Sequence, residues 1–199
     1  MRTMAAYGVV LGAALLLAPL LWLGADKADQ HSQWLDRAPE LLPAAVRGEP
    51  FAQAKLGAIY YHEQMYADAL RWLDLATDQG DPWGTVLLGL MYEEGKGVRQ
   101  NHDTAVVLYM TAAKDGNVVG QFLLGLAYRK GAGVEQDLDL AVSMISKLAQ
   151  QGMKPAQTEL ADMYYEGDGV PQDHLKAYEW EMKAAQQGYF AESFWQREY

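Results

Sequence analysis

The sequence predicts an all-α fold, a solenoid of stacked helical hairpins with an N-terminal transmembrane or signal helix. Two observations predict the hairpins. Glycine recurs every 36 residues, at Gly80, Gly116, Gly152 and Gly188. The motif Tyr-x-x-Gly-x-Gly-Val recurs at the same interval, beginning at Tyr92, Tyr128 and Tyr164. A fixed period of this length is typical of repeat proteins, in which each unit packs only on its neighbours.

The N-terminal segment is expected to anchor the chain in a membrane or to direct its export. Residues 4–24 contain no charged side chain, and about 20 apolar residues at 1.5 Å each match the roughly 30 Å core of a bilayer. Arg2 precedes this stretch, and a positive charge before a membrane helix favours an N-terminus on the cytoplasmic side, with the rest of the chain on the other side of the membrane. A signal-peptidase site ending at Ala25 is a poor match because Leu23 stands where a small residue is preferred. We therefore expect an uncleaved anchor over residues 1–25, with a cleaved signal sequence as the alternative.

Composition excludes several classes of protein. The chain has 199 residues, half of them apolar, so it can bury a sizeable core. Its 16 Lys and Arg against 26 Asp and Glu give a net charge of −10. Nucleic acid is a poor partner, because phosphate binding needs a basic stripe and none is present. The absence of cysteine excludes disulfides and a lipid-modified cysteine.

The unit over residues 81–116 shows how one repeat forms two helices. Asp81 followed by Pro82 is typical of an N-cap and a first helical position, and apolar residues continue at helical spacing to Glu94. The Gly-x-Gly pair that starts at Gly95 supplies a left-handed backbone that ends this helix. Asn101 is placed to cap the second helix, as Asp137 and Asp173 are in the next two units.

Small residues are predicted to let neighbouring helices approach closely. One set lies near the start of each first helix, at Ala52, Gly84, Gly120 and Ala156. A second set lies in the middle of the same helices, at Gly57, Gly89, Gly125 and Ala161.

The expected domain organisation follows from these units. After a polar tether over residues 26–32, the repeat domain spans residues 33–199. Its full units cover about residues 49–80, 81–116, 117–152 and 153–188, and residues 41–48 are expected to close a preceding second helix. Residues 189–199 are predicted to be the first helix of a further unit that caps the solenoid, or alternatively a hydrophobic docking surface.

A family resemblance rests on the runs LLGLMYEEGKGVRQNHDTAVVLYMTAAKDG and LLGLAYRKGAGVEQDLDLAVSMISKLAQQG, which begin at Leu87 and Leu123. These resemble the Sel-one-like branch of the tetratricopeptide repeats, over residues 49–199. The resemblance implies a right-handed αα superhelix whose concave groove binds proteins or peptides as a scaffold or adaptor, often in bacterial envelopes. The first unit lacks the Gly-x-Gly-Val loop and is more similar to an ordinary tetratricopeptide repeat.

In this family the groove is lined by the first helices of the repeats. The resemblance therefore implies a groove formed by Tyr61, His62, Leu90, Glu93, Glu94, Leu126, Arg129, Lys130, Asp162, Tyr165 and Glu166. The third unit is basic at Arg129 and Lys130, where its neighbours are acidic or aromatic. We expect a partner segment with both signs of charge and an aromatic or aliphatic anchor. The alternative is that these side chains are ordinary solvated helix ends.

No pattern in the sequence indicates chemistry. The four histidines form no HExxH pair and there is no cysteine to complete a zinc site, so no metal is expected. The Gly-x-Gly pairs lack a third glycine, and none of the four serines lies in a GxSxG turn. The sequence thus predicts no catalytic residue, no cofactor and no small-molecule substrate.

Together these features predict a non-catalytic protein-binding scaffold or adaptor of the bacterial cell envelope. It would be a single-pass protein of the inner membrane, with its repeats in the periplasm. Two alternatives remain open: a periplasmic, secreted or host-facing interaction protein after signal cleavage, and an envelope enzyme that acts on peptidoglycan or β-lactams.

Overall fold

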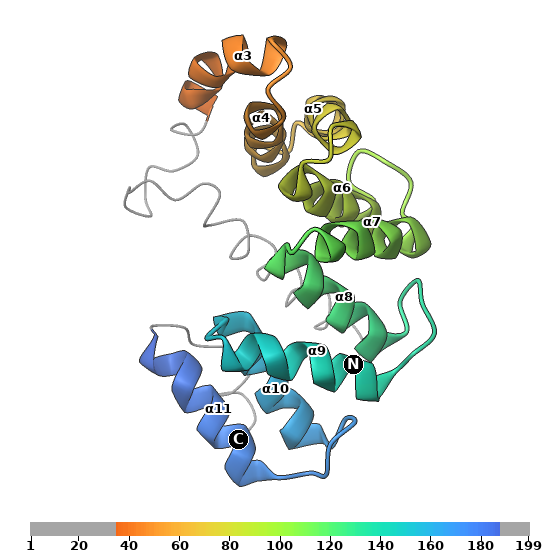
Figure 1. Ribbon diagram of the computed structural model, residues 1–199, viewed down its shortest axis with the longest axis vertical. Helices are drawn as coiled ribbons and strands as arrows, with labels where there is room; N and C mark the ends of the chain where they lie inside the picture. Colours follow the sequence, from red (N-terminus) through yellow and green to blue (C-terminus); the bar gives the residue numbers. More distant parts are fainter. Residues whose placement is uncertain (1–34, 188–199) are drawn as a thin grey trace. The chain divides into compact units, whose positions relative to one another are not determined.

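A computed structural model describes residues 35–187, and every regular element in this range is helical. The all-α prediction is therefore confirmed for the described part of the chain. The chain divides into two compact units, residues 1–120 and 121–199. Figure 1 shows the helices in chain order, joined by short connections.

In the first unit, the described residues begin with a short 3₁₀ helix, η1 (Leu35–Arg37), and continue through five helices. These are α3 (Ala38–Val46), α4 (Pro50–His62), α5 (Tyr66–Asp78), α6 (Pro82–Glu94) and α7 (His102–Lys114). Helices α4 and α5 pack on each other as one hairpin, and α6 and α7 as the next. Helix α6 also packs on both α4 and α5, so the two hairpins share one core.

The second unit holds the remaining two hairpins. Helix α8 (Val118–Lys130) starts in the last residues of the first unit and is followed by α9 (Leu138–Gln150), α10 (Lys154–Glu166) and α11 (His174–Gln186). Helix α10 packs on α9 and on α11. Each helix from α4 to α11 has 13 residues, a length of about 20 Å. The repeat is therefore uniform in its helices, and its variation lies in the loops.

The predicted helix caps are confirmed. The Asp81 carboxylate accepts hydrogen bonds from the backbone N–H groups of Trp83 and Gly84 at 3.0 and 2.8 Å. Asn101 caps α7, and Asp137 and Asp173 cap α9 and α11 in the same way. Each cap satisfies backbone donors that the first helical turn leaves without a partner.

The first repeat differs from the others at the turn between its helices. Where later repeats place glycines, this turn has Gln64, the one residue other than glycine with a positive φ (60°) within residues 35–187. The backbone N–H of Gln64 donates to the Tyr61 carbonyl, and that of Met65 donates to the Tyr60 carbonyl. The end of α5 has the same pattern, in which the Gly80 N–H donates to the Thr77 carbonyl and the Asp81 N–H donates to the Ala76 carbonyl. Gln64 thus adopts a conformation that favours glycine.

The small residues in the first helices lie at close helix contacts, as predicted. A Cβ atom added at Gly84 would lie 2.7 Å from the Cβ of Ala76, and one added at Gly89 would lie 2.6 Å from the Tyr109 ring. Side chains larger than hydrogen would separate the helices at these points.

Several sequence predictions fall outside the described residues. They concern the apolar stretch 4–24, the tether 26–32 and the segment 189–199. Between residues 35 and 187, none of the helices combines the length and hydrophobicity that crossing a bilayer requires.

Candidate functional site

The predicted groove residues cluster at the C-terminal ends of the first helices. We call the two residues that follow each repeat tyrosine the last-turn pair. The pairs are Tyr61 and His62 on α4, Glu93 and Glu94 on α6, Arg129 and Lys130 on α8, and Tyr165 and Glu166 on α10.

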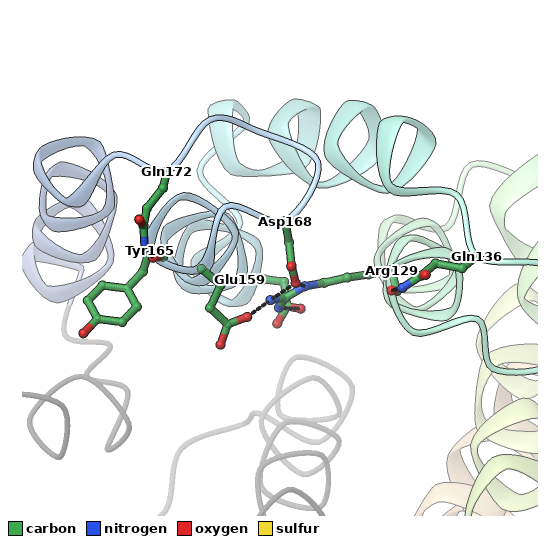
Figure 2. Close-up of polar contacts among 7 residues, drawn as sticks. Arg129, Gln136, Glu159, Tyr165, Asp168 and Gln172 are labelled. Atoms are coloured by element: carbon green, nitrogen blue, oxygen red, sulfur yellow. Dashed lines mark hydrogen bonds and ion pairs between the residues drawn. The ribbon is translucent and has the colours of Figure 1, made fainter.

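Arg129 is bound by three carboxylates of the following repeat. Its Nη1 donates to Glu159 Oε1 at 2.6 Å, and its Nε and Nη2 donate to Asp168 Oδ2 at 3.1 and 2.8 Å. Nη2 also donates to Glu166 Oε2. Figure 2 shows the guanidinium extending from α8 to Glu159 on α10 and to Asp168 in the loop after it. We call this group the Arg129 clamp.

The clamp keeps Arg129 charged while removing it from solvent. Burial by itself would lower the pKa of Arg129, but the attraction and hydrogen bonds of Glu159, Asp168 and Glu166 outweigh it and raise the pKa. The guanidinium side chain is mostly buried. The expectation of an exposed positive charge at this position is therefore wrong for Arg129, which pairs within the protein.

Tyr61 makes a related contact in the first unit. Its hydroxyl donates to Glu94 Oε2 and accepts from Lys96 Nζ at 3.3 Å, and Lys96 also pairs with Glu94 at 3.0 Å. The ammonium group of Lys96 lies over the Tyr61 ring, 5.0 Å from its centroid. Burial, and secondarily the Glu94 carboxylate, raises the pKa of the Tyr61 hydroxyl. Tyr61 therefore joins its own repeat to the next one as a neutral donor.

The two contacts occupy the same repeat positions. In each, the first residue of a last-turn pair reaches the second residue of the next pair, Glu94 or Glu166. It also reaches the residue between the two glycines of the next loop, Lys96 or Asp168. Tyr61 and Arg129 thus link consecutive repeats, a role that the sequence interpretation did not give them.

Glu93 and Leu90 are also used internally. Glu93 accepts a hydrogen bond from the hydroxyl of Tyr109 in its own hairpin at 2.6 Å. Burial, together with the Glu93 charge, raises the pKa of Tyr109 well above its usual value. Leu90 has no exposed surface. It belongs to the core of the first unit and cannot touch a partner, contrary to the expectation that it lines the groove.

The remaining predicted residues reach the surface to different degrees. Lys130, Tyr165 and Glu166 are exposed, and His62, Leu126 and Asp162 are half-buried. The Tyr165 ring packs edge-on against the imidazole of His174, with 4.8 Å between centroids. On the second unit, the exposed residues thus combine a cation, an aromatic ring and a carboxylate. Their role in binding stays a prediction.

A glutamine that sequence reasoning missed holds each Gly-x-Gly loop. Gln100, Gln136 and Gln172 each donate from Nε2 to a last-turn carbonyl at 2.8 Å, and the acceptors are Glu93, Arg129 and Tyr165. Figure 2 shows Gln136 and Gln172 folded back onto their helices. The 36-residue spacing of these glutamines is the signal that could have revealed them.

Glu159 and Asp168 were also missed as members of the Arg129 clamp. Neither residue lies near Arg129 in the sequence, and an acidic residue in a loop or on a helix is common in this acidic chain. Only the packing of α10 beside α8 reveals their role. Within residues 35–187, no group of three or more His, Asp and Glu side chains is arranged to hold a metal ion.

Comparison with known proteins identifies the family of these repeats. The family model described as Sel1 repeat matches residues 50–81, 85–117, 118–153 and 154–189. These four segments cover more than half of the chain. The chain belongs to the Sel1 repeat family. Its helical repeat fold is that of this family. Proteins of the Sel1 repeat family are typically non-catalytic scaffolds for protein interactions.

Two solved structures are similar to this Sel1 repeat chain. One is a protective antigen of uropathogenic Escherichia coli that displays an SLR fold, with 36% identity and a TM-score of 0.67 over 76% of this chain and 33% of that chain. The other is a Sel1 repeat protein from Oxalobacter formigenes, with 36% identity and a TM-score of 0.64 over 82% of this chain and 49% of that chain.

A mouse protein, DAP3-binding cell death enhancer 1, is 39% identical over 85 residues, or 41% of this chain. The chain thus spans 17% of the mouse protein and less than half of each of the two crystallised chains.

Proposed function

We propose that this Sel1 repeat chain is a non-catalytic scaffold of the bacterial cell envelope that binds a protein segment across the last turns of α8 and α10. The observation that carries this proposal is the Arg129 clamp. It fixes α8 to α10 and to the loop after α10 through three carboxylates. The backbone positions of the exposed residues Lys130, Tyr165 and Glu166 are thereby fixed relative to one another. A surface held in one geometry loses little entropy on binding.

The charge around the clamp favours a partner with basic residues. Glu159, Glu166 and Asp168 contribute three negative charges and Arg129 one positive charge, which leaves −2. This net negative charge attracts a Lys or Arg side chain of a partner. The Tyr165 ring offers an apolar contact for an aromatic or aliphatic side chain next to that cation. We therefore propose a partner segment with a cation next to an aromatic or aliphatic side chain, together with an acidic residue for Lys130.

The proposed scaffold has no catalytic activity. The polar groups gathered on the last turns bind one another, as Tyr109 binds Glu93 and Arg129 binds Glu159. These contacts hold helices together, and this structural use of the polar groups supports a binding role. The mouse relative is described as a DAP3-binding protein, and binding rather than catalysis is what we propose for this chain as well.

The experiment is a crosslinking pull-down in the native host with two variants. Lys130→Glu reverses a charge on the proposed surface, and Lys147→Glu reverses a charge that is also exposed, on the second helix α9. We expect Lys130→Glu to reduce recovery of the crosslinked partner by about tenfold, the effect of one lost charge pair of 1–2 kcal/mol. Lys147→Glu should leave recovery unchanged. Equal recovery from both variants would show that the surface is misplaced.

The envelope location is tested separately. We propose that residues 4–24 anchor the chain in the inner membrane because of their length and lack of charge. Mass determination of the mature protein should give an intact N-terminus, and fractionation should place it with the inner membrane. A mature protein that starts near Asp26 would instead support secretion or release into the periplasm.

A further inference from the structure

In the first unit, Tyr61 on α4, Tyr66 on α5 and Glu94 on α6 surround the ammonium group of Lys96, and we call these three residues the tyrosine cage. The two rings meet edge-on, with 5.9 Å between their centroids. The Lys96 Nζ atom lies 5.0 Å from the Tyr61 centroid and 5.8 Å from the Tyr66 centroid. It is also 3.0 Å from Glu94 Oε2. Aromatic faces and a carboxylate are the groups with which proteins bind ammonium ligands.

The Glu94 carboxylate is buried, but only one of its oxygens has a partner. Its side chain is 9% exposed, and Oε2 both accepts a hydrogen bond from the Tyr61 hydroxyl and pairs with Lys96. Oε1 is also buried, and it has no hydrogen-bond partner within residues 35–187. A buried carboxylate oxygen without a donor is unfavourable. Oε1 can therefore accept a donor that the described part of the chain does not supply.

Lys96 can leave the cage without disturbing the fold. Its side chain is 28% exposed, against 9% for Glu94, so the ammonium group can move into solvent while the buried carboxylate stays in place. Its flexible stem and strongly hydrated charge lower the cost of this movement. The turn itself depends on Gly95 and Gly97, which both have a positive φ. The next Gly-x-Gly loop has Ala132 at the position of Lys96, so this position does not require lysine.

An ammonium group from outside can bind the cage more completely than Lys96 does. Lys96 follows Glu94 by only two residues, and its ammonium group contacts Oε2 and, at 3.3 Å, the Tyr61 hydroxyl. An ammonium group has three donors, and one that is not tethered to this loop can reach Oε1 as well. The charge also favours a cation, because Glu93 and Glu94 together with Lys96 leave a net charge of −1.

We propose that the tyrosine cage is a binding site for an alkylammonium group, such as a lysine side chain, which enters when Lys96 moves out into solvent. Lys96 is then an internal competitor, since the cage is available only in the fraction of molecules in which Lys96 has left. A state populated at about 10% or less weakens the apparent affinity at least ~10-fold. The cage shares no residue with the surface proposed on α8 and α10, so the two proposals succeed or fail separately.

Titration of the full chain with n-butylammonium chloride at constant ionic strength tests the cage, with the NMR signals of labelled tyrosine rings as the readout. We expect Lys96→Ala to bind n-butylammonium at least ~10-fold more tightly than the unsubstituted chain. Lys114→Ala removes an exposed lysine of α7 and should leave the affinity unchanged. For Lys96→Ala, the uncharged analogue 1-butanol should bind at least ~10-fold more weakly than n-butylammonium. Equal affinities of Lys96→Ala and Lys114→Ala, or of the two ligands, would overturn the proposal.

Two second substitutions in the Lys96→Ala chain test different sides of the cage. Glu94→Gln keeps an oxygen that can accept from Tyr61 but removes the charge, and it should weaken binding at least ~10-fold. Tyr66→Leu places at the start of α5 the residue that Leu138 provides at the start of α9. Loss of one aromatic face should weaken binding by roughly 2–5-fold. Circular dichroism checks that each variant is helical, and an unchanged affinity in either helical variant would contradict the cage.

A peptide with a single lysine flanked by glycines, with both ends capped, distinguishes the two sources of an alkylammonium group. Binding of the peptide to Lys96→Ala as tightly as n-butylammonium supports the site and indicates the lysine of a partner protein. Binding of n-butylammonium alone also supports the site and indicates a free amine. Absence of ring shifts at Tyr61 and Tyr66 with both ligands would overturn the proposal.

Discussion

Replacing Arg129 with methionine tests the clamp between the third and fourth repeats. Methionine keeps much of the side-chain length but leaves Glu159, Glu166 and Asp168 without their shared cation. The Arg129 side chain is 12% exposed and Glu159 19%, whereas Glu166 is 49% exposed and Asp168 39%. The bond to Glu159 is therefore the shielded one, and water and salt screen the other two.

These exposures set the expected magnitude. A largely buried, charge-assisted hydrogen bond contributes about 1.5–3 kcal/mol, and each screened ion pair contributes about 0–1 kcal/mol. The sum for Arg129→Met is a loss of about 3 kcal/mol in the free energy of unfolding. Arg129→Lys should recover only part of it, because an ammonium group cannot reproduce the forked contacts of a guanidinium.

Urea denaturation followed by the helix signal measures this loss, with Lys130→Met as the matched control. Lys130 is the next residue and is exposed, so its replacement should change stability by less than about 0.5 kcal/mol. A double-mutant cycle of Arg129→Met with Glu159→Gln should give a coupling energy of about 1.5–3 kcal/mol. A loss below about 1 kcal/mol, or equal losses for Arg129→Met and Lys130→Met, would refute the account of a buried clamp.

Two further predictions follow from local geometry and from burial. Gln64→Gly should stabilise the chain by about 0.5–1 kcal/mol in the same assay. Glycine relieves the strain of the left-handed backbone, about 1–2 kcal/mol, and this gain exceeds the cost of the greater entropy of glycine in the unfolded chain. A loss of stability would contradict the strain at that turn. Burial raises the pKa of both Tyr61 and Tyr109 in the folded state. The unfolded chain therefore releases their protons first, and the free energy of unfolding should fall as pH rises above about 10. The double variant Tyr61→Phe, Tyr109→Phe should flatten this fall in urea titrations between about pH 8 and 11. An unchanged slope in the double variant would argue against buried, neutral hydroxyls.

Local sequence patterns were sufficient for the hairpins and their caps. The N-cap at Asp81 depends on a side chain that reaches backbone N–H groups only two and three residues away. The turn at Gly95 depends on the positive φ of that residue and of Gly97, two residues away. Because these interactions act over only a few residues, the 36-residue period was enough to place the helices from α6 to α11.

The candidate site was predicted less well. The resemblance identified the last-turn positions, but it treated them all as one accessible surface. In the structure Leu90 is core, Glu93 accepts a bond from Tyr109, and Tyr61 and Arg129 bind the next repeat. Lys130, Tyr165 and Glu166 remain exposed. Which side chains are available to a partner depends on neighbours far away in the sequence, 16 residues for Tyr109 and Glu93 and 39 for Arg129 and Asp168.

The sequence by itself determined the repeat, its two helices, their caps and the small residues at their contacts, because each depends on backbone conformation or on side-chain size within one unit. Only the tertiary structure decided which charges are available. A carboxylate such as Glu159 looks the same in the sequence whether it faces water or Arg129, and the difference arises only when α10 packs beside α8 and excludes water from the pair.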